Sequence, residues 1–225
     1  MLPIVVTYNV STTSSTTALG ATQGSGSGLL TVTNKTAFTP YQQRVTITSA
    51  GNDTGIYFHI IGLNDQNYTI SEYLVGGLGT GLAASAVTVQ SNLDYGFIIS
   101  IQPSGSSTAQ TLGTTAGSVS VGLNGVGSSL WNIVNWHAMP SNISYGTSLD
   151  TAANATWSIQ YTYDDPNNLA VGVTYPQPFN HPTIVNATAT IDGASNDPIT
   201  AWRVLITAGT GIVRAVGIQG GIGSP

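Results

Sequence analysis

The chain has 225 residues, of which four are Lys or Arg and nine are Asp or Glu, giving a formal net charge of −5. Charged residues make up 6 % of the chain, whereas they make up roughly a quarter of an average soluble domain. The scattered basic residues cannot neutralise a run of phosphates, so we expect no nucleic acid and no anionic membrane as a partner. The single Glu and single Lys cannot provide the outer faces of long solvated helices.

The remaining composition indicates a β-rich globular protein. Hydrophobic residues make up 41 % of the chain, which is enough for a core, and small polar residues replace the missing charges, with 23 Ser, 31 Thr and 27 Gly. No apolar run reaches the about 18 residues that a transmembrane helix needs. The absence of Cys excludes disulfides, thiolate metal sites and a cysteine nucleophile. A surface this poor in charge is typical of a protein whose neighbours cover it in an assembly.

The first element in the chain is an alternating β-branched segment over residues 4–10, which predicts one strand. Residues 11–28 are rich in Ser, Thr and Gly, a composition that predicts a flexible linker. A tethered strand must pair with a sheet, either in its own chain or in another subunit. For the second case, the candidate inter-subunit contact residues are Ile4, Val5, Val6, Tyr8 and Val10.

Short β-patterns separated by turns fill the rest of the chain, which we divide into a first β-domain over 29–123 and a second over 124–225. In the first domain, strands are predicted over 44–49, 56–61, 68–75, 87–89, 95–101 and 118–122, with a glycine-rich segment over 76–81. In the second, they are predicted over 130–136, 155–163, 185–191, 201–207 and 211–218. This spacing is typical of β-sandwich or jelly-roll-like domains.

The three histidines and the adjacent acids show no metal-binding pattern. His59, His137 and His181 stand in unrelated contexts without ligand spacing, so we expect no metal and no other cofactor. Asp164 and Asp165, followed by two Asn, could offer oxygens to Ca²⁺. The same residues around Pro166 are favoured as the turn that ends a strand.

The remaining side chains offer little support for catalysis or sugar binding. A glycosidase needs two carboxylates about 5–10 Å apart, and Glu72 is the only Glu while most Asp fall in predicted turns, so we expect no enzyme. Exposed aromatic residues would favour a carbohydrate-binding module. Trp131, Trp136, Trp157 and Trp202 all lie in apolar strand-like segments, which favours the core for them.

Several segments resemble virion structural proteins of tailed bacteriophages. The first resembling module is carried by RVTITSAGNDTGIYFHIIGLNDQNYTISEYLVGG (44–77), FIISIQPSGSST (97–108) and SVSVGLNG (118–125). A second is carried by ATWSIQYTYDDPNN (155–168) and ITAWRVLITAGTGIVRAVGIQGG (199–221). These are patterns of strands and turns, and the resemblance transfers no catalytic residue.

The resemblance implies a capsid decoration (cement) protein on the virion exterior, whose partner is the major capsid protein. It also implies a homo-oligomer, with a trimer as the expected form. Two alternatives stay open from the sequence. One is a tail or head-fibre component with receptor binding, and the other is a carbohydrate-binding β-sandwich.

Overall fold

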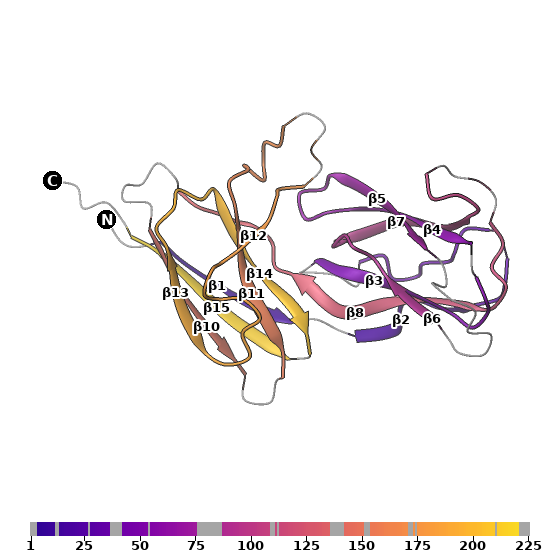
Figure 1. Cartoon of the computed structure of the whole chain (residues 1–225), viewed down its shortest axis with the longest axis horizontal. Helices are drawn as coiled ribbons and strands as arrows, with labels where there is room; N and C mark the ends of the chain where they lie inside the picture. Colours follow the sequence, from indigo (N-terminus) through magenta and orange to yellow (C-terminus); the bar gives the residue numbers. More distant parts are fainter. Residues whose placement is uncertain are drawn as a thin grey trace. The chain divides into compact units, whose positions relative to one another are not determined.

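The computed structural model describes residues 4–11, 14–26, 28–36, 42–53, 55–75, 87–108, 111, 113–135, 142–150, 154–170, 173, 175–209 and 211–220. Every regular element in these ranges is a β-strand (Figure 1), which confirms the predicted all-β class. No helix that could cross a membrane occurs in this part of the chain. The predicted glycine-rich segment 76–81 lies outside the described residues, as do Trp136 and His137.

The described strands follow one another in chain order. The first are β1 (Ile4–Ser11), β2 (Ser14–Gln23), β3 (Gln42–Ser49), β4 (Tyr57–Leu63), β5 (Thr69–Val75), β6 (Val87–Gln90), β7 (Phe97–Ser104) and β8 (Val119–Ser128). They are followed by β9 (Asn132–Ile133), β10 (Ile143–Leu149), β11 (Thr156–Thr162), β12 (Phe179–Asn180), β13 (Ile191–Ser195), β14 (Ala201–Ala208) and β15 (Ile212–Gln219).

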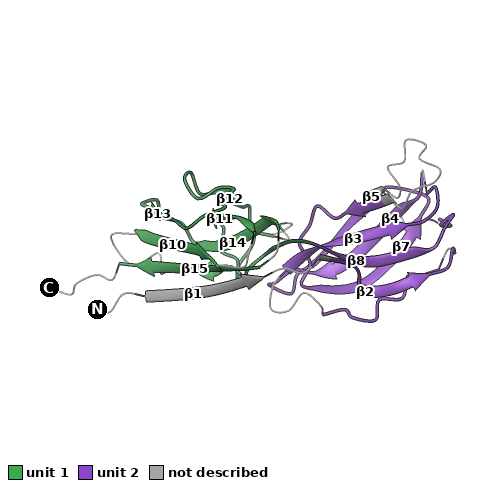
Figure 2. Cartoon of the chain, turned by 90° about the horizontal axis from the view of Figure 1, so that it is seen from below, with its two compact units in different colours: residues 1–12, 125–225 green, residues 13–124 purple. Residues whose placement is uncertain are grey.

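The chain forms two compact units, coloured separately in Figure 2. Unit 2 comprises Thr13–Asn124, and unit 1 comprises Gly125–Pro225 together with the first residues, Met1–Thr12. The sequence placed the start of the second domain at residue 124 and treated the N-terminal strand as a separate element. In the structure β1 instead belongs to unit 1, because it pairs with β15 over its whole length.

Unit 2 has two antiparallel sheets around one core. One sheet has the order β5-β4-β7, and the other contains β8, β3 and β6, with β2 paired to β8. On β4 the burial alternates strictly, so Phe58 and Ile60 face inward, as expected for a strand with one face on a core. The core is built from buried apolar residues of both sheets: Leu19, Val32, Val45, Ile47, Phe58, Ile60, Ile70, Leu74, Val89, Tyr95, Ile98, Ile101, Val119, Val121 and Leu123.

Unit 1 also contains two sheets. One has the order β1-β15-β10-β13, and the other has β12-β11-β14, with β9 paired to β14. Trp202 of β14 is buried between them: its ring meets Tyr145 of β10 edge-on at 5.3 Å and lies directly over Gly217 of β15. A Cβ at Gly217 would lie 2.3 Å from the Trp202 ring, so only glycine allows the two strands to approach this closely.

The predicted linker is replaced in part by strand β2. Residues 14–23 pair irregularly with β8, and Leu19 is completely buried in the core of unit 2. The carbonyl of Leu19 also accepts hydrogen bonds from the amides of Thr33 and Asn34. Composition alone predicted flexibility here because one buried Leu among Ser, Thr and Gly is a weak local signal that tertiary packing overrides.

Two further strands differ from the sequence prediction in unit 1. The strand predicted over 185–191 is wrong, because Asn186 has φ = +50°, which interrupts an extended conformation, and β13 begins only at Ile191. Strand β10 was missed, although it pairs with both β15 and β13. Its inward residues Ile143, Tyr145 and Thr147 alternate with Ser144 and Gly146, so its sequence lacks a continuous apolar signal.

We predict that Gly217→Ala destabilises unit 1 by about 1–3 kcal/mol, because the added methyl group overpacks the Trp202 ring. All four Trp lie between residues 131 and 202, so Trp fluorescence during urea unfolding reports on unit 1 alone. Gly146→Ala, also in unit 1, is the matched control, since a Cβ there meets only the Asp192 carboxylate, at an ordinary 3.5 Å. Equal unfolding midpoints for the two variants would show that the close approach is not required.

Candidate functional site

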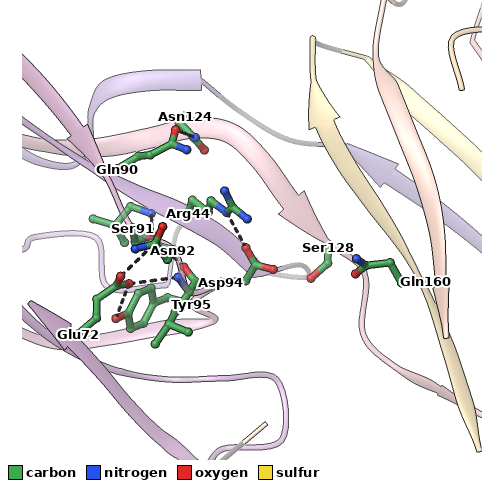
Figure 3. A network of polar contacts seen from close by, with 12 residues as sticks. Arg44, Glu72, Gln90, Ser91, Asn92, Asp94, Tyr95, Asn124, Ser128 and Gln160 are labelled. Atoms are coloured by element: carbon green, nitrogen blue, oxygen red, sulfur yellow. Dashed lines mark hydrogen bonds and ion pairs between the residues drawn. The ribbon is translucent and has the colours of Figure 1, made fainter. Parts of the chain in front are cut away.

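The only Glu of the chain lies in a polar network inside unit 2 (Figure 3). Glu72, on β5, accepts hydrogen bonds from the backbone amides of Asn92 at 2.9 Å and Leu93 at 3.2 Å. The Tyr95 hydroxyl donates a third hydrogen bond to the Glu72 carboxylate at 3.1 Å. The three donors all come from residues 92–95, the connection between β6 and β7, so the carboxylate ties this connection to β5.

The same connection is held by two more side chains. Ser91 accepts a hydrogen bond from the amide of Val45 at 2.9 Å and donates one to the carbonyl of Leu93 at 2.8 Å. The Arg44 guanidinium lies 3.4 Å from the carboxylate of Asp94. Both carboxylates of this network, Glu72 and Asp94, are therefore bonded to groups of the surrounding chain.

Burial sets the protonation of this network. Loss of water raises the pKa of Glu72 above its ordinary value of 4.5, against the opposing effect of its hydrogen bonds and of Arg44. Burial and the adjacent Glu72 carboxylate also raise the pKa of Tyr95, which keeps the phenol protonated as a donor. The network can hold and orient the connection between β6 and β7, because its polar groups bond to one another.

His181 is buried in unit 1 and fixed by hydrogen bonds on both ring nitrogens. Nδ1 lies 3.3 Å and 3.2 Å from the amides of Thr183 and Ile184, which donate to it, so this nitrogen carries no proton. Nε2 lies 3.1 Å from the carbonyl oxygen of Ala194, to which it donates. His59 stacks on Tyr73 at 4.1 Å between ring centroids. In the described ranges, no three His, Asp or Glu side chains form a metal-binding group.

The Asp164 and Asp165 segment forms the predicted turn. Asp165 accepts a hydrogen bond from the amide of Asn167 at 2.9 Å, and the Asp164 carboxylate accepts one from the amide of Gln177 at 2.7 Å. These bonds use the carboxylates to shape the backbone after β11 and to hold the segment before β12.

Three of the four tryptophans belong to the core, as the sequence favoured. Trp157 and Trp202 are fully buried, and Trp131 is 8 % exposed. The guanidinium of Arg203 lies 4.6 Å from the Trp131 ring and also donates to Gln160 and Ser128, each at 3.0 Å. Among the described residues, the most exposed aromatic side chains are Tyr163, Tyr175 and Phe179, which sequence reasoning missed because it weighed only tryptophans.

The N-terminal strand is the candidate assembly element. β1 lies at one edge of its sheet and pairs antiparallel with β15, from Ile4 opposite Gln219 to Ser11 opposite Ile212. The register places Val6, Tyr8 and Val10 opposite Gly217, Ala215 and Val213, and the last two are completely buried. The side chains of Ile4, Val5, Val6, Tyr8 and Val10 lie outside the described part of the chain. Pairing of β1 within its own chain is one of the two possibilities that the sequence left open.

Comparison with known proteins gives no assignment: no family model, no characterised protein and no solved structure matches the chain. The resemblance to virion structural proteins therefore stays a prediction.

We predict that the stability of unit 2 falls as pH rises above about 4.5 and that Glu72→Gln lacks this dependence. The pKa of Glu72 is higher in the folded state than in the unfolded state, so the folded state holds the proton over the interval between the two values. The free energy of unfolding therefore decreases as pH rises through that interval and is constant above it.

The measurement is urea unfolding of both proteins across that interval, followed by the amide resonance of Ile60 in β4 because unit 2 contains no Trp. The free energy of unfolding of wild type minus that of the variant cancels the effect of the other acids and reports on residue 72. If this difference rises with pH, or does not change with pH, the raised pKa of Glu72 is contradicted.

Proposed function

We propose that this protein is a non-enzymatic structural component of a tailed-bacteriophage virion, of the capsid decoration type, that binds the major capsid protein on the virion exterior as a homo-oligomer, expected to be a trimer. The resemblance to virion β-modules of residues 44–77, 97–108 and 118–125, and of residues 155–168 and 199–221, supports this proposal. The few charged side chains support the structural role as well, because Glu72, Asp94 and Arg203 all bond to neighbouring groups of the same chain.

The observation that carries the proposal is the position of β1. An eight-residue strand from the start of the chain forms the edge of a sheet by pairing with the last strand, β15. Addition of an extended segment to a sheet edge is a general mode of protein recognition, in which backbone hydrogen bonds supply the affinity. In the proposed assembly, β1 of one copy pairs with a neighbouring subunit.

Deletion of residues 1–11 tests the need for β1. A deletion reaching residue 28 is unsuitable, because it also removes Leu19 from the core of unit 2. We expect the shortened protein to occupy capsids of the encoding virus at least tenfold less than the full chain, measured by co-sedimentation. Trp fluorescence provides the control that unit 1 is still folded. Unchanged capsid occupancy would contradict the proposed role of β1.

A reversible crosslink tests strand exchange without removing any residue. Asn9 lies opposite the exposed Arg214, and directly opposed residues in antiparallel strands lie close enough for a disulfide. The chain has no Cys of its own, so Asn9→Cys/Arg214→Cys creates a single defined pair. We expect the oxidised form, with β1 locked to its own β15, to bind capsids weakly and the reduced form to bind normally.

The Arg214→Cys single variant is the control for the crosslink. It cannot form a disulfide within the chain, so any change in its capsid binding on reduction does not come from locking β1. Equal capsid occupancy of the double variant before and after reduction would rule out exchange of β1 between subunits.

A further inference from the structure

Three aromatic side chains form a patch on the surface of unit 1, and none of them is used by the proposed assembly. We call Tyr161, Tyr163 and Phe179 the aromatic patch. The ring centroids of Tyr161 and Phe179 lie 5.9 Å apart with the planes 22° from parallel. Tyr163 lies 5.6 Å from Tyr161 and 5.5 Å from Phe179, so each ring touches the other two.

Strand pairing explains why the three rings meet. Tyr161 of β11 is directly opposite Phe179 of β12, and Tyr163 is two residues further along the chain, which is the spacing of side chains on one face of a strand. The Asp164 carboxylate holds the amide of Gln177 just before β12, which fixes the approach of Phe179. The patch is therefore assembled from two segments that local sequence does not connect.

The patch is exposed in front and supported behind. Tyr163 is 49 % exposed and Phe179 is 42 % exposed. On the other side of the patch, Tyr161 is the cross-strand partner of Trp202 on β14, and Trp202 is buried against Tyr145. The Tyr145 ring in turn packs on the His181 ring, with 5.4 Å between the centroids. Rings held by a packed core lose little conformational entropy when a ligand stacks on them.

The segment that carries the patch is rich in acceptors, and the guanidinium of Arg203 on the neighbouring strand β14 is engaged by Gln160, Ser128 and the Trp131 ring. Residues 160–200 include four Asp and no Lys or Arg. Loss of water, the Tyr161 hydroxyl and the nearby Asp197 all raise the pKa of Tyr163, so its phenol stays neutral. This environment repels anionic ligands and offers hydrogen-bond acceptors to hydroxyl groups.

The size of the patch distinguishes between classes of ligand. Aromatic side chains bury about 200 Å² each, so three rings no more than half exposed offer about 250 Å². A stable protein interface needs about 800 Å² from each partner, several times more. The patch matches the dimensions of one or two sugar rings.

We propose that the aromatic patch of Tyr161, Tyr163 and Phe179 binds a neutral saccharide, whose apolar ring face stacks on Phe179 and Tyr163 while its hydroxyl groups bond the neighbouring carboxylates. Neutral pyranoses present C–H groups on one face and hydroxyl donors around the rim, which matches exposed rings bordered by acceptors. The site is independent of β1 and of capsid binding, so it would give a virion component a second contact.

The test uses the full chain on an array of neutral and anionic glycans, followed by calorimetry with the neutral hexasaccharides of glucose and of N-acetylglucosamine. We expect binding to at least one neutral glycan, with Phe179→Ala and Tyr163→Ala weakening it at least tenfold. Ile212→Ala is the matched control, because Ile212 is equally exposed at 42 % on β15 and should leave binding unchanged. Trp fluorescence verifies that each variant retains folded unit 1.

A second measurement needs no variant. In saturation-transfer NMR of the wild-type chain, saturation of aromatic protons should pass to the ring C–H protons of the bound sugar, and raising the salt concentration should not weaken binding. The proposal is overturned if no neutral glycan binds, if only anionic glycans bind, or if the two alanine variants bind as tightly as wild type.

Discussion

The pairing of β15 with both β1 and β10 is the interaction on which unit 1 depends. β15 pairs along its whole length with the first strand of the chain and along most of it with β10, so both of its edges are used. Its inward positions bring Val213 and Ala215 into the core and place Gly217 against Trp202. The last strand thus has both edges paired only when β1 lies beside it.

In both units a half-buried charged side chain is surrounded by hydrogen-bonding partners. A partly buried carboxylate is tolerated when enough donors face it, and Glu72 meets three. Arg203 is likewise satisfied by an amide, a hydroxyl and the face of Trp131. These ionised groups fix a turn or join strands, and short Ser and Thr side chains supply many of the other polar contacts.

The aromatic residues show how burial can change along one strand. The alternation over 155–163 correctly predicts that Trp157, Tyr161 and Tyr163 share a face of β11. Trp157 at one end is fully buried, whereas Tyr163 beyond the other end is half exposed. The two-residue period of the sequence predicts on which face of the strand a side chain lies. The extent of the opposing sheet decides how far along that face the core continues.

The sequence by itself determined the all-β class, most strands of strong alternation and the turn at Asp164 and Asp165, because side-chain period and turn chemistry are local properties. Only the tertiary structure decided that β1 joins the unit of the C-terminal strands, that residues 14–23 form a strand, and that β10 pairs with β15. It also decided that Glu72 meets residues 92–95 and that Phe179 meets Tyr161 and Tyr163. These pairings join segments far apart in the chain, and their energies come from burial and backbone hydrogen bonds that no single segment contains.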